Sequence, residues 1–250
     1  MYNRLIIGNR KHHLTKTNST NSYTKAFIKN NLVAEGTVII ADEQTQGRGQ
    51  YGNDWLSAKG ENLTFSIVLF PKYLKATEQF LLSQAISLGT VHYLKTKTNL
   101  PISIKWPNDI LIDTKKVCGI LIENSLHSAH ISESIVGIGL NVNQTEFSSE
   151  VKKATSLKIT TAENYLLPKE LELLLNYLDK FYLQLMQGRH HLLRKQYLQN
   201  LFRLNEKHFF MLNEEKIEGT IKDVSLSGQL EILIDHKLQR FNNKEIEFVY

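Results

Sequence analysis

A short glycine-rich segment, residues 47–52 (GRGQYG), has the residue types needed to hold a negatively charged ligand. Glycine allows a turn that points backbone N–H groups at an anion, and Arg48 adds a permanent positive charge. An ordinary surface turn has the same composition, and the spacing matches neither a Walker A loop nor a dinucleotide-binding fingerprint. Trp55 follows the segment and is able either to stack on a purine or to fill the core.

Two further segments place charged side chains beside expected strands. Residues 105–109 (KWPND) bring a lysine, a carboxamide and a carboxylate to a turn at a strand end, where sites are commonly built, although Pro-Asn-Asp is also ordinary turn chemistry. Residues 116–123 (KVCGILIE) begin with Lys116, and Gly119 permits close approach to this apolar strand. Most lysines at such positions simply face solvent.

Residues 137–143 (GIGLNVN) combine alternating glycines with carboxamides. Gly137 and Gly139 fall on one face of the expected strand and leave space against a flat ligand, and Asn141 is able to pair with an adenine edge. Glycines in a strand also mark bulges, so this segment alone does not decide between a site and a structural irregularity.

The periodicity of the chain indicates the elements that position these segments. Helices are expected at residues 22–32, 78–95, 170–186 and 190–204, and strands at residues 37–41, 62–70, 102–106, 110–112, 116–123 and 131–142. The second helix places Leu81, Leu82, Ala85, Ile86, Leu88 and Val91 on one face. Gln187-Gly188 ends the third helix as a C-cap. Short turns between the strands favour an α+β fold, a mixed β-sheet flanked by helices, over a doubly wound fold.

The pattern changes near Asn205. Residues 208–250 form short alternating segments joined by turns such as Asn213-Glu214 and Ser227-Gly228, which predicts a small C-terminal β-barrel. We therefore expect two domains, residues 1–204 and residues 205–250. All of the chemical segments lie in the first, so removal of residues 206–250 is expected to leave the ligand contacts of these segments intact, yet to impair the protein if the small domain braces the large one.

The composition narrows the class of protein. With 42% hydrophobic and 22% charged residues in 250, the chain resembles globular proteins and contains no apolar run that could span a bilayer. The absence of a signal-peptide pattern and the single cysteine, Cys118, predict a cytoplasmic protein without disulfides. The net charge of +5 permits nucleotides or nucleic acid as ligands, but the basic residues are scattered, which favours an ordinary solvated surface.

The order and spacing of these segments resemble the catalytic domain of biotin protein ligases. The resemblance covers roughly residues 15–160 and rests on STN at 19–21, Gln44 with GRGQYGNDW, KWPNDI, KVCGILIE, VGIGLNVN and ATSL at 154–157. It implies a sheet related to class II aminoacyl-tRNA synthetases and a small SH3-like C-terminal domain. It also implies an enzyme that uses ATP and Mg²⁺ to convert biotin to biotinyl-5'-AMP, and then transfers biotin to a lysine of a carboxylase's biotin carrier domain.

The resemblance assigns roles to residues by matching position. Ser19, Thr20 and Gln44 match residues that hold biotin, Gly47 and Arg48 those at the carboxylate and phosphate, Gly119 the back of the biotin pocket, and Trp55 and Asn141 the adenine contacts. Lys116 matches the active-site lysine, and Asn108 and Asp109 match residues near the phosphates and Mg²⁺. Asn21, Gly49, Gln50, Lys105 and Gly137 complete the expected ligand-binding set. We expect Lys116, Arg48 and Asp109 to be catalytic, with Asp109 a hypothetical proton acceptor in the transfer step.

The glycine-rich loop departs from the family pattern. Gln50 and Asn53 stand where arginines are common, so the adenylate is expected to be held less tightly unless another cation such as Lys59 fills in.

Partners and alternatives follow from the same resemblance. The motif at Ser19 begins near the start of the sequence, so neither an N-terminal DNA-binding domain nor DNA binding is expected, and we expect a monomer or weak homodimer. Two alternatives stay open: a lipoate or octanoyl protein ligase of the related fold, and a non-catalytic module such as a biotin sensor or an RNA-binding barrel.

Overall fold

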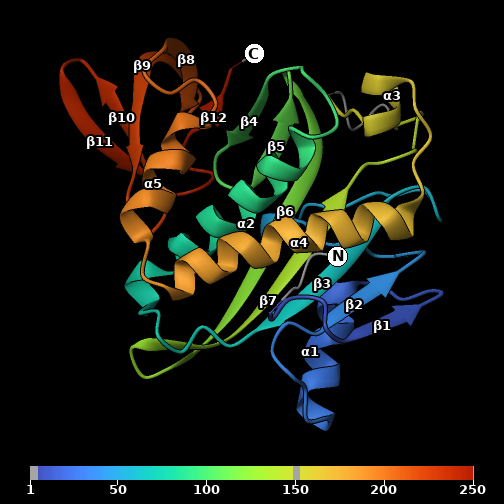
Figure 1. The fold of residues 1–250 in the computed structure, drawn as a ribbon. Coiled ribbons are helices and arrows are strands. Elements are labelled where there is room, and N and C mark those ends of the chain that lie inside the picture. Colours follow the sequence, from blue (N-terminus) through green and yellow to red (C-terminus); the bar gives the residue numbers. More distant parts are fainter. Residues whose placement is uncertain (1–4, 149–152, 250) are drawn as a thin grey trace.

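A seven-stranded mixed sheet forms the centre of the computed structural model, which describes residues 5–148 and 153–249 (Figure 1). Its strand order is β1-β2-β3-β7-β6-β5-β4. The strands are β1 (Lys11–Leu14), β2 (Val38–Ala41), β3 (Leu63–Leu69), β4 (Ile102–Lys105), β5 (Asp109–Ile112), β6 (Lys115–His127) and β7 (His130–Leu140). Only the β1–β2 pair is parallel among these neighbours, so the predicted α+β fold with a mixed sheet is confirmed.

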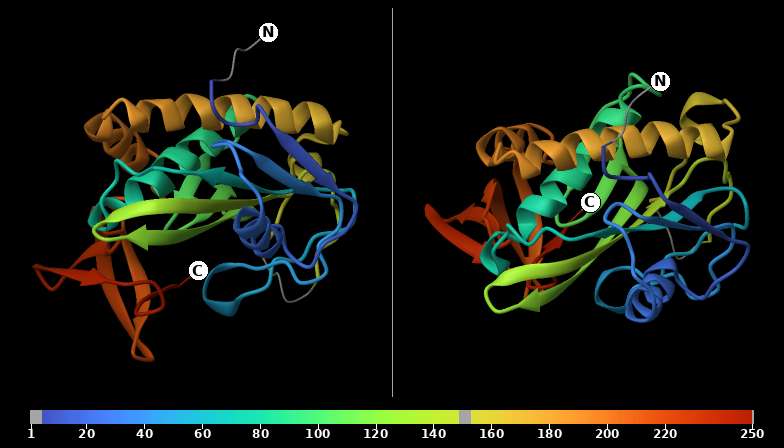
Figure 2. Two further views of the ribbon diagram at one scale, coloured as in Figure 1. Left: turned by 90° about the horizontal axis from the view of Figure 1, so that it is seen from below. Right: turned by 60° about the horizontal axis from the view of Figure 1, so that its bottom comes forward.

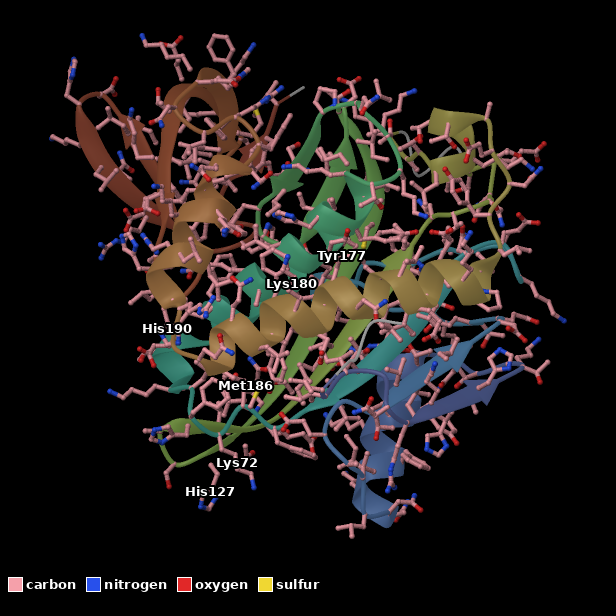
Figure 3. The ribbon with its side chains drawn as sticks, in the orientation of Figure 1. Lys72, His127, Tyr177, Lys180, Met186 and His190 are labelled. Atoms are coloured by element: carbon pink, nitrogen blue, oxygen red, sulfur yellow. The ribbon has the colours of Figure 1, made fainter. Side chains whose placement is uncertain are left out.

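Helices cover both faces of this sheet. α4 (Leu167–Met186) and α2 (Phe80–Leu94) lie on one face, with α5 (His190–Gln199) beside α2, while α1 (Thr20–Asn30) contacts β3 and β7 from the opposite face (Figure 2). On α4, Lys180 and Met186 are exposed, whereas Tyr177 is partly buried against the core (Figure 3). Three short helices complete the list: η1 (Gln50–Gly52), η2 (Ala76–Glu78) and α3 (Leu157–Thr161).

The prediction of a one-sided α2 is wrong, because the helix is buried almost all round. Gln84, Ser87 and Thr90 are buried along with its apolar residues, since α2 packs against α4, α5 and the sheet. α5 ends at Gln199, earlier than expected, whereas the stop after α4 is confirmed by Gly188, which has a φ of +71°. β1 escaped prediction because its sequence, KHHL, is polar and mostly exposed.

Five strands form a second, smaller sheet, here called the C-terminal sheet, in the order β11-β10-β9-β8-β12. They are β8 (Lys207–Leu212), β9 (Glu215–Val224), β10 (Leu230–Ile234), β11 (Lys237–Phe241) and β12 (Glu247–Phe248). The predicted C-terminal meander is thus confirmed, including the turn at Asn213 and Glu214, which both have positive φ. The division into domains at residues 204 and 205 stays a prediction.

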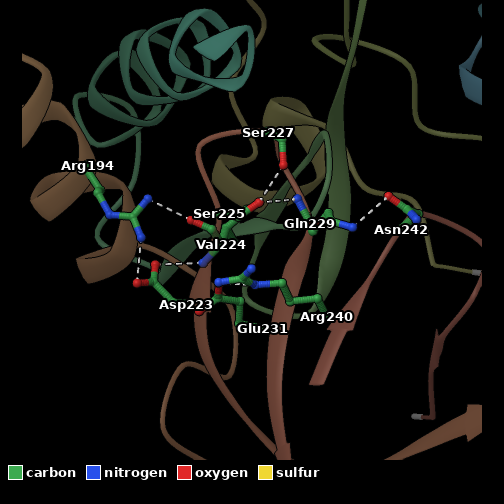
Figure 4. A network of polar contacts seen from close by, with 9 residues as sticks. All are labelled: Arg194, Asp223, Val224, Ser225, Ser227, Gln229, Glu231, Arg240 and Asn242. Carbon is green, nitrogen blue, oxygen red and sulfur yellow. Dashed lines mark hydrogen bonds and ion pairs between the residues drawn. The ribbon is translucent and has the colours of Figure 1, made fainter. Parts of the chain in front are cut away.

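Arg194 on α5 anchors the C-terminal sheet to the helical layer (Figure 4). Its guanidinium donates to Asp223 Oδ2 at 2.6 Å and to the Val224 carbonyl at 2.7 Å. The backbone also ties the end of α5 to the large sheet, because Ile104 N on β4 donates to Asn200 O at 2.7 Å. No helix in the described part of the chain is long and apolar enough to cross a membrane.

Candidate functional site

A cavity of about 370 Å³ is lined by residues of the large sheet, the loops around it and the C-terminal sheet. It brings together most of the residues singled out from the sequence: Ser19, Thr20, Asn21, Gln44, Arg48, Gly49, Gln50, Trp55, Lys105, Asn108, Asp109, Lys116, Gly119 and Gly137. Gly47 and Asn141 are the two that do not line it. We call this hollow the catalytic cavity.

One part of the catalytic cavity is polar but uncharged. At the start of α1, the backbone N–H and the Oγ1 of Thr20 donate to Gln44 Oε1 at 2.7 and 3.1 Å. Asn21 is held by Ser66, whose hydroxyl donates to Asn21 Oδ1 at 2.7 Å, and a Cβ at Gly137 would come within 2.3 Å of the same oxygen. A glycine is therefore required at residue 137 to admit Asn21. Fixed amide and hydroxyl groups of this kind suit a neutral hydrogen-bonding ligand.

The predicted anion loop is closed by its own backbone. Gly49 N donates to Asn53 O at 2.7 Å, and Trp55 N donates to Gly47 O at 2.8 Å. A Cβ at Gly47 would lie 2.3 Å from the Trp55 carbonyl oxygen, so Gly47 shapes the loop from behind the cavity wall. The glycine predicted to touch a ligand therefore has a structural role in this geometry.

Arg48 supplies the positive charge of this loop, and that charge is already paired. Its guanidinium lies 3.1 Å from Glu123 Oε1 and donates to Ser22 Oγ at 3.3 Å. Because Arg48 and Glu123 remain partly exposed, an anionic ligand can compete with Glu123 for the guanidinium. The charge of Arg48 is therefore already paired, and it can bind an anionic ligand when that ligand displaces Glu123.

The glycines of β6 and β7 make space for a flat group, and that group is the indole of Trp55. A Cβ would lie 2.2 Å from the indole at Gly139 and 3.0 Å from it at Gly119. The expected gap for a planar ligand is therefore filled by a side chain of the protein itself. Trp55 Nε1 is buried and has no hydrogen-bond partner among the described residues.

Lys116 and Asp109 form an ion pair in the cavity, with 2.7 Å between Nζ and Oδ1. The ammonium also lies 5.5 Å from the Trp55 ring centroid. Asn108 fixes the turn before Asp109, because its Nδ2 donates to Ile120 O at 2.8 Å while Ile120 N donates to Asn108 O at 3.0 Å. A cation able to stabilise developing negative charge and a carboxylate able to accept a proton are therefore adjacent.

The neighbouring Cys118 does not take part in this chemistry. It is fully buried, and burial raises the pKa of its thiol well above the ordinary value, so the nucleophilic thiolate is disfavoured.

Asn141 lies behind the wall rather than in it. Its Nδ2 donates to Thr155 O at 3.0 Å, and Thr155 N donates to Lys116 O at 2.9 Å. Asn141 therefore secures the segment that runs alongside Lys116. Its Oδ1 is buried without a partner among the described residues, and contact with an adenine stays a prediction.

The sequence reasoning missed the wall supplied by the C-terminal sheet and the segment that joins β11 to β12, namely Asn243, Lys244, Ile246, Glu247 and Phe248. Asn243 Nδ2 donates to Gln50 Oε1 at 3.1 Å, and the Lys105 ammonium lies 5.2 Å from the Phe248 ring centroid. The cavity thus extends beyond the segments singled out from the sequence, whereas the expectation that biotin contacts survive removal of residues 206–250 stays a prediction. No motif marks these residues, since their role arises only from the docking of the two sheets.

Two further contacts refine the sequence predictions about this wall. Trp106 Nε1 donates to the Gly228 carbonyl at 2.8 Å, at a residue whose φ of +97° favours glycine. Lys59, named above as one cation that could stand in for a missing loop arginine, does not line the cavity, and its Nζ lies 3.8 Å from Glu43 Oε2. Lys244 is the additional lysine that the C-terminal sheet brings to the cavity.

Metal ligands are sparse around this site. Within residues 5–148 and 153–249, no group of three or more His, Cys, Asp or Glu side chains is arranged to hold a metal ion. Asn108 and Asp109 line the cavity, but their role toward Mg²⁺ stays a prediction.

Comparison with known proteins places these features in a family. The sequence profile described as the biotin/lipoate A/B protein ligase family matches residues 14–141. The bifunctional ligase/repressor BirA of Bacillus spizizenii is 38% identical over 149 residues, which cover 58% of this chain and 45% of that protein. The biotin–[acetyl-CoA-carboxylase] ligase of Paracoccus denitrificans is 32% identical over 130 residues, covering 52% and 53%.

Among solved structures, the biotin protein ligase from Aquifex aeolicus in complex with biotin and ATP superposes with a TM-score of 0.80 at 30% identity. The match covers 96% of this chain and 99% of that one. It extends the similarity over the C-terminal sheet, whereas the chain spans about half the length of the curated relatives it matches.

Proposed function

This chain belongs to the biotin/lipoate A/B protein ligase family, and from that premise we propose that it is a biotin protein ligase. The reaction has two steps: ATP activates biotin as biotinyl-5'-AMP, and a lysine of an acceptor protein then takes the biotin. The observation that supports this most directly is the Lys116–Asp109 pair beside the Arg48 loop in one cavity.

In the first step, the carboxylate of biotin attacks the α-phosphate of ATP, and pyrophosphate leaves. Two anions must meet, so fixed positive charge lowers the barrier. We assign this charge to Lys116 and Arg48, each of which is paired with a carboxylate. A substrate oxygen would take the place of Glu123 at Arg48, whereas Lys116 would bind substrate without giving up Asp109.

The uncharged part of the cavity suits the ring of biotin. A cyclic urea both donates and accepts hydrogen bonds, as do the hydroxyl and carboxamide groups of Thr20 and Gln44. The opposite part suits a nucleotide, because Trp55 offers a planar face and a buried indole N–H that lacks a partner. This division supports a substrate with a neutral end and an anionic end.

We also propose that Asn108 and Asp109 help to hold Mg²⁺. Two oxygen-bearing side chains fit Mg²⁺, which usually keeps several waters and takes its remaining ligands from substrate phosphates. When bound, the ion would withdraw charge from the departing pyrophosphate. Asp109 would then divide its charge between Mg²⁺ and Lys116.

In the second step, the lysine nitrogen attacks the carbonyl carbon of the mixed anhydride. A C–N bond forms, the C–O bond to AMP breaks, and AMP leaves with that electron pair. The attacking amine must lose a proton, and Asp109 is the cavity carboxylate we propose to accept it. We propose that the acceptor is the biotin carrier domain of a carboxylase and that the reaction takes place in the cytoplasm, where ATP is available.

The family description covers both biotin and lipoate, so the substrate needs a direct test. The relatives reported above carry the names of biotin ligases or a BirA ligase/repressor, which favours biotin. The purified chain should be incubated with ATP, Mg²⁺, a biotin carrier domain and either biotin or lipoate, and the products read by mass spectrometry.

We expect biotinylation that depends on ATP, and no lipoylation. Modification by lipoate alone would make the chain a lipoate ligase. Biotin binding without pyrophosphate release would make it a non-catalytic biotin-binding module.

A further inference from the structure

A second hollow of about 330 Å³ lies beside the catalytic cavity. Gln50, Trp106, Pro107, Ile120 and Asn243 line both, so the two hollows are direct neighbours that share these residues. The second hollow lies between the start of α2, β6 and the C-terminal sheet. Thr20 lines the catalytic cavity but not this second hollow. We call the second hollow the neutral groove.

None of the residues that line the neutral groove carries a charge, although charged residues make up 22% of the chain. The catalytic cavity differs, because Arg48, Lys105, Lys116 and Lys244 line it together with Asp54, Asp109 and Glu247. An aliphatic side chain that lies along the groove therefore contacts no charged lining residue before it reaches the cavity.

The lining of the groove suits an extended peptide that carries a long aliphatic side chain. Phe80, Ile120 and Ile122 provide apolar surface for methylene groups. Carboxamides provide paired donors and acceptors for a peptide backbone: Asn124 Nδ2 donates to Gln79 Oε1 at 3.1 Å, which leaves the Nε2 group of Gln79 directed to other partners. Gln79 is exposed at the surface, where an approaching chain would meet it first.

We propose that the neutral groove receives the lysine-bearing segment of the acceptor protein and guides its amine to the adenylate. This rests on the proposed function and names the path of its second substrate. An uncharged, partly apolar passage favours the neutral amine over the ammonium form, and the neutral amine is the nucleophile. The groove thus desolvates the lysine before it reaches Asp109 in the catalytic cavity.

A groove-filling substitution tests the path without touching the catalytic cavity. Ser83 lies on α2, lines the groove and is absent from the cavity lining, so Ser83→Trp should block the passage. Ala26→Trp, at an exposed position of α1, is the matched control. Three rates are measured for each protein: pyrophosphate release on adenylate formation, transfer to a biotin carrier domain, and consumption of preformed adenylate by hydroxylamine, a nucleophile small enough to need no groove.

For Ser83→Trp we expect adenylate formation and hydroxylamine consumption within about twofold of wild type, and kcat/KM for the carrier domain reduced on the order of a hundredfold. Ala26→Trp should match wild type in all three. Normal transfer by Ser83→Trp would overturn the proposal, and so would an equal loss toward hydroxylamine and the carrier domain. Failure of wild type to form adenylate would instead refute the proposed function.

A milder variant keeps the test open if Ser83→Trp does not fold. Gln79→Ala removes a groove carboxamide at an exposed position and should raise the KM for the carrier domain about three- to tenfold while kcat and adenylate formation hold. An unchanged KM for the carrier domain would count against the groove as the docking path.

Discussion

The catalytic cavity has two walls that are built in different ways. In the wall made by the large sheet, strand register fixes the functional groups: β5 pairs with β6 and β6 with β7, which sets Asp109, Lys116 and the glycines beside Trp55. The wall made by the C-terminal sheet is attached mainly by side chains, through hydrogen bonds such as Asn243 to Gln50 and Trp106 to Gly228 and through apolar packing continuous with the main core. A wall fixed by backbone pairing suits precise chemistry, whereas one fixed by side chains can adjust more readily around a ligand.

Loss of the central cation in the first wall should have the largest effect. Lys116→Ala removes a positive charge from the site where negative charge gathers, so adenylate formation should fall on the order of a hundred- to a thousandfold. Stability should change little, because Lys116 is partly exposed. The control is Lys115→Ala, at the exposed neighbouring position, measured by pyrophosphate release. A wild-type rate for Lys116→Ala would remove Lys116 from the mechanism.

Loosening the attachment of the second wall should come next. Arg194→Ala deletes the bonds to Asp223 and Val224 and should lower the free energy of unfolding by about 1 to 2 kcal/mol, after allowance for partial exposure. The KM for ATP should rise more than the KM for biotin, since the C-terminal wall faces the loop around Gln50. Urea unfolding and steady-state kinetics give both quantities. Equal changes in the KM for ATP and the KM for biotin would mean that the C-terminal wall does not act on ATP in particular.

A positive charge added at residue 50 of the glycine-rich loop should strengthen the contact between this loop and the phosphate of the adenylate. Gln50→Arg replaces a neutral donor by a charged one, so release of biotinyl-adenylate should slow about fivefold with biotin affinity unchanged. The substitution also removes the acceptor for Asn243, which limits the gain. Stopped-flow release of preformed adenylate measures the effect, and identical off-rates would show that position 50 does not reach the phosphate.

The smallest effect is expected from the contact between the walls itself. Asn243→Ala removes the hydrogen bond to Gln50 and should raise the KM for ATP about threefold, because one neutral hydrogen bond is lost. Asn99→Ala, at an exposed position elsewhere, is the control. A lowered KM would show that the contact opposes ATP binding and must break before the cavity closes.

The sequence predicted the residues of the first wall better than those of the second. Local patterns located the strands of the large sheet and brought Lys116, Asp109 and Arg48 to one cavity, because period-two alternation and turn chemistry are encoded within a few residues. The direction of Asn141 was not predictable, since its side chain faces Thr155 rather than the cavity. The contact between Gln50 and Asn243 joins residues 193 positions apart, and no local pattern encodes it.

The burial of α2 on nearly every side shows a related limit. Its polar residues Gln84, Ser87 and Thr90 mimic a solvent-facing side, but they are buried because α2 packs against α4, α5 and the sheet. Only the packing of three separate elements reveals this, and a helical pattern read alone does not contain it.

The chain has two tryptophans, and both lie in the catalytic cavity. Trp55 rests on the glycines of the large sheet, whereas the indole N–H of Trp106 is bonded to the C-terminal sheet at Gly228. When tryptophan is excited selectively over the ten tyrosines, the emission therefore originates within the site, and Trp106 reports on the contact with the C-terminal sheet. Trp55→Phe and Trp106→Phe would each leave a single emitter, so that the order in which the two walls respond to added ligand becomes an optical measurement that needs no attached dye.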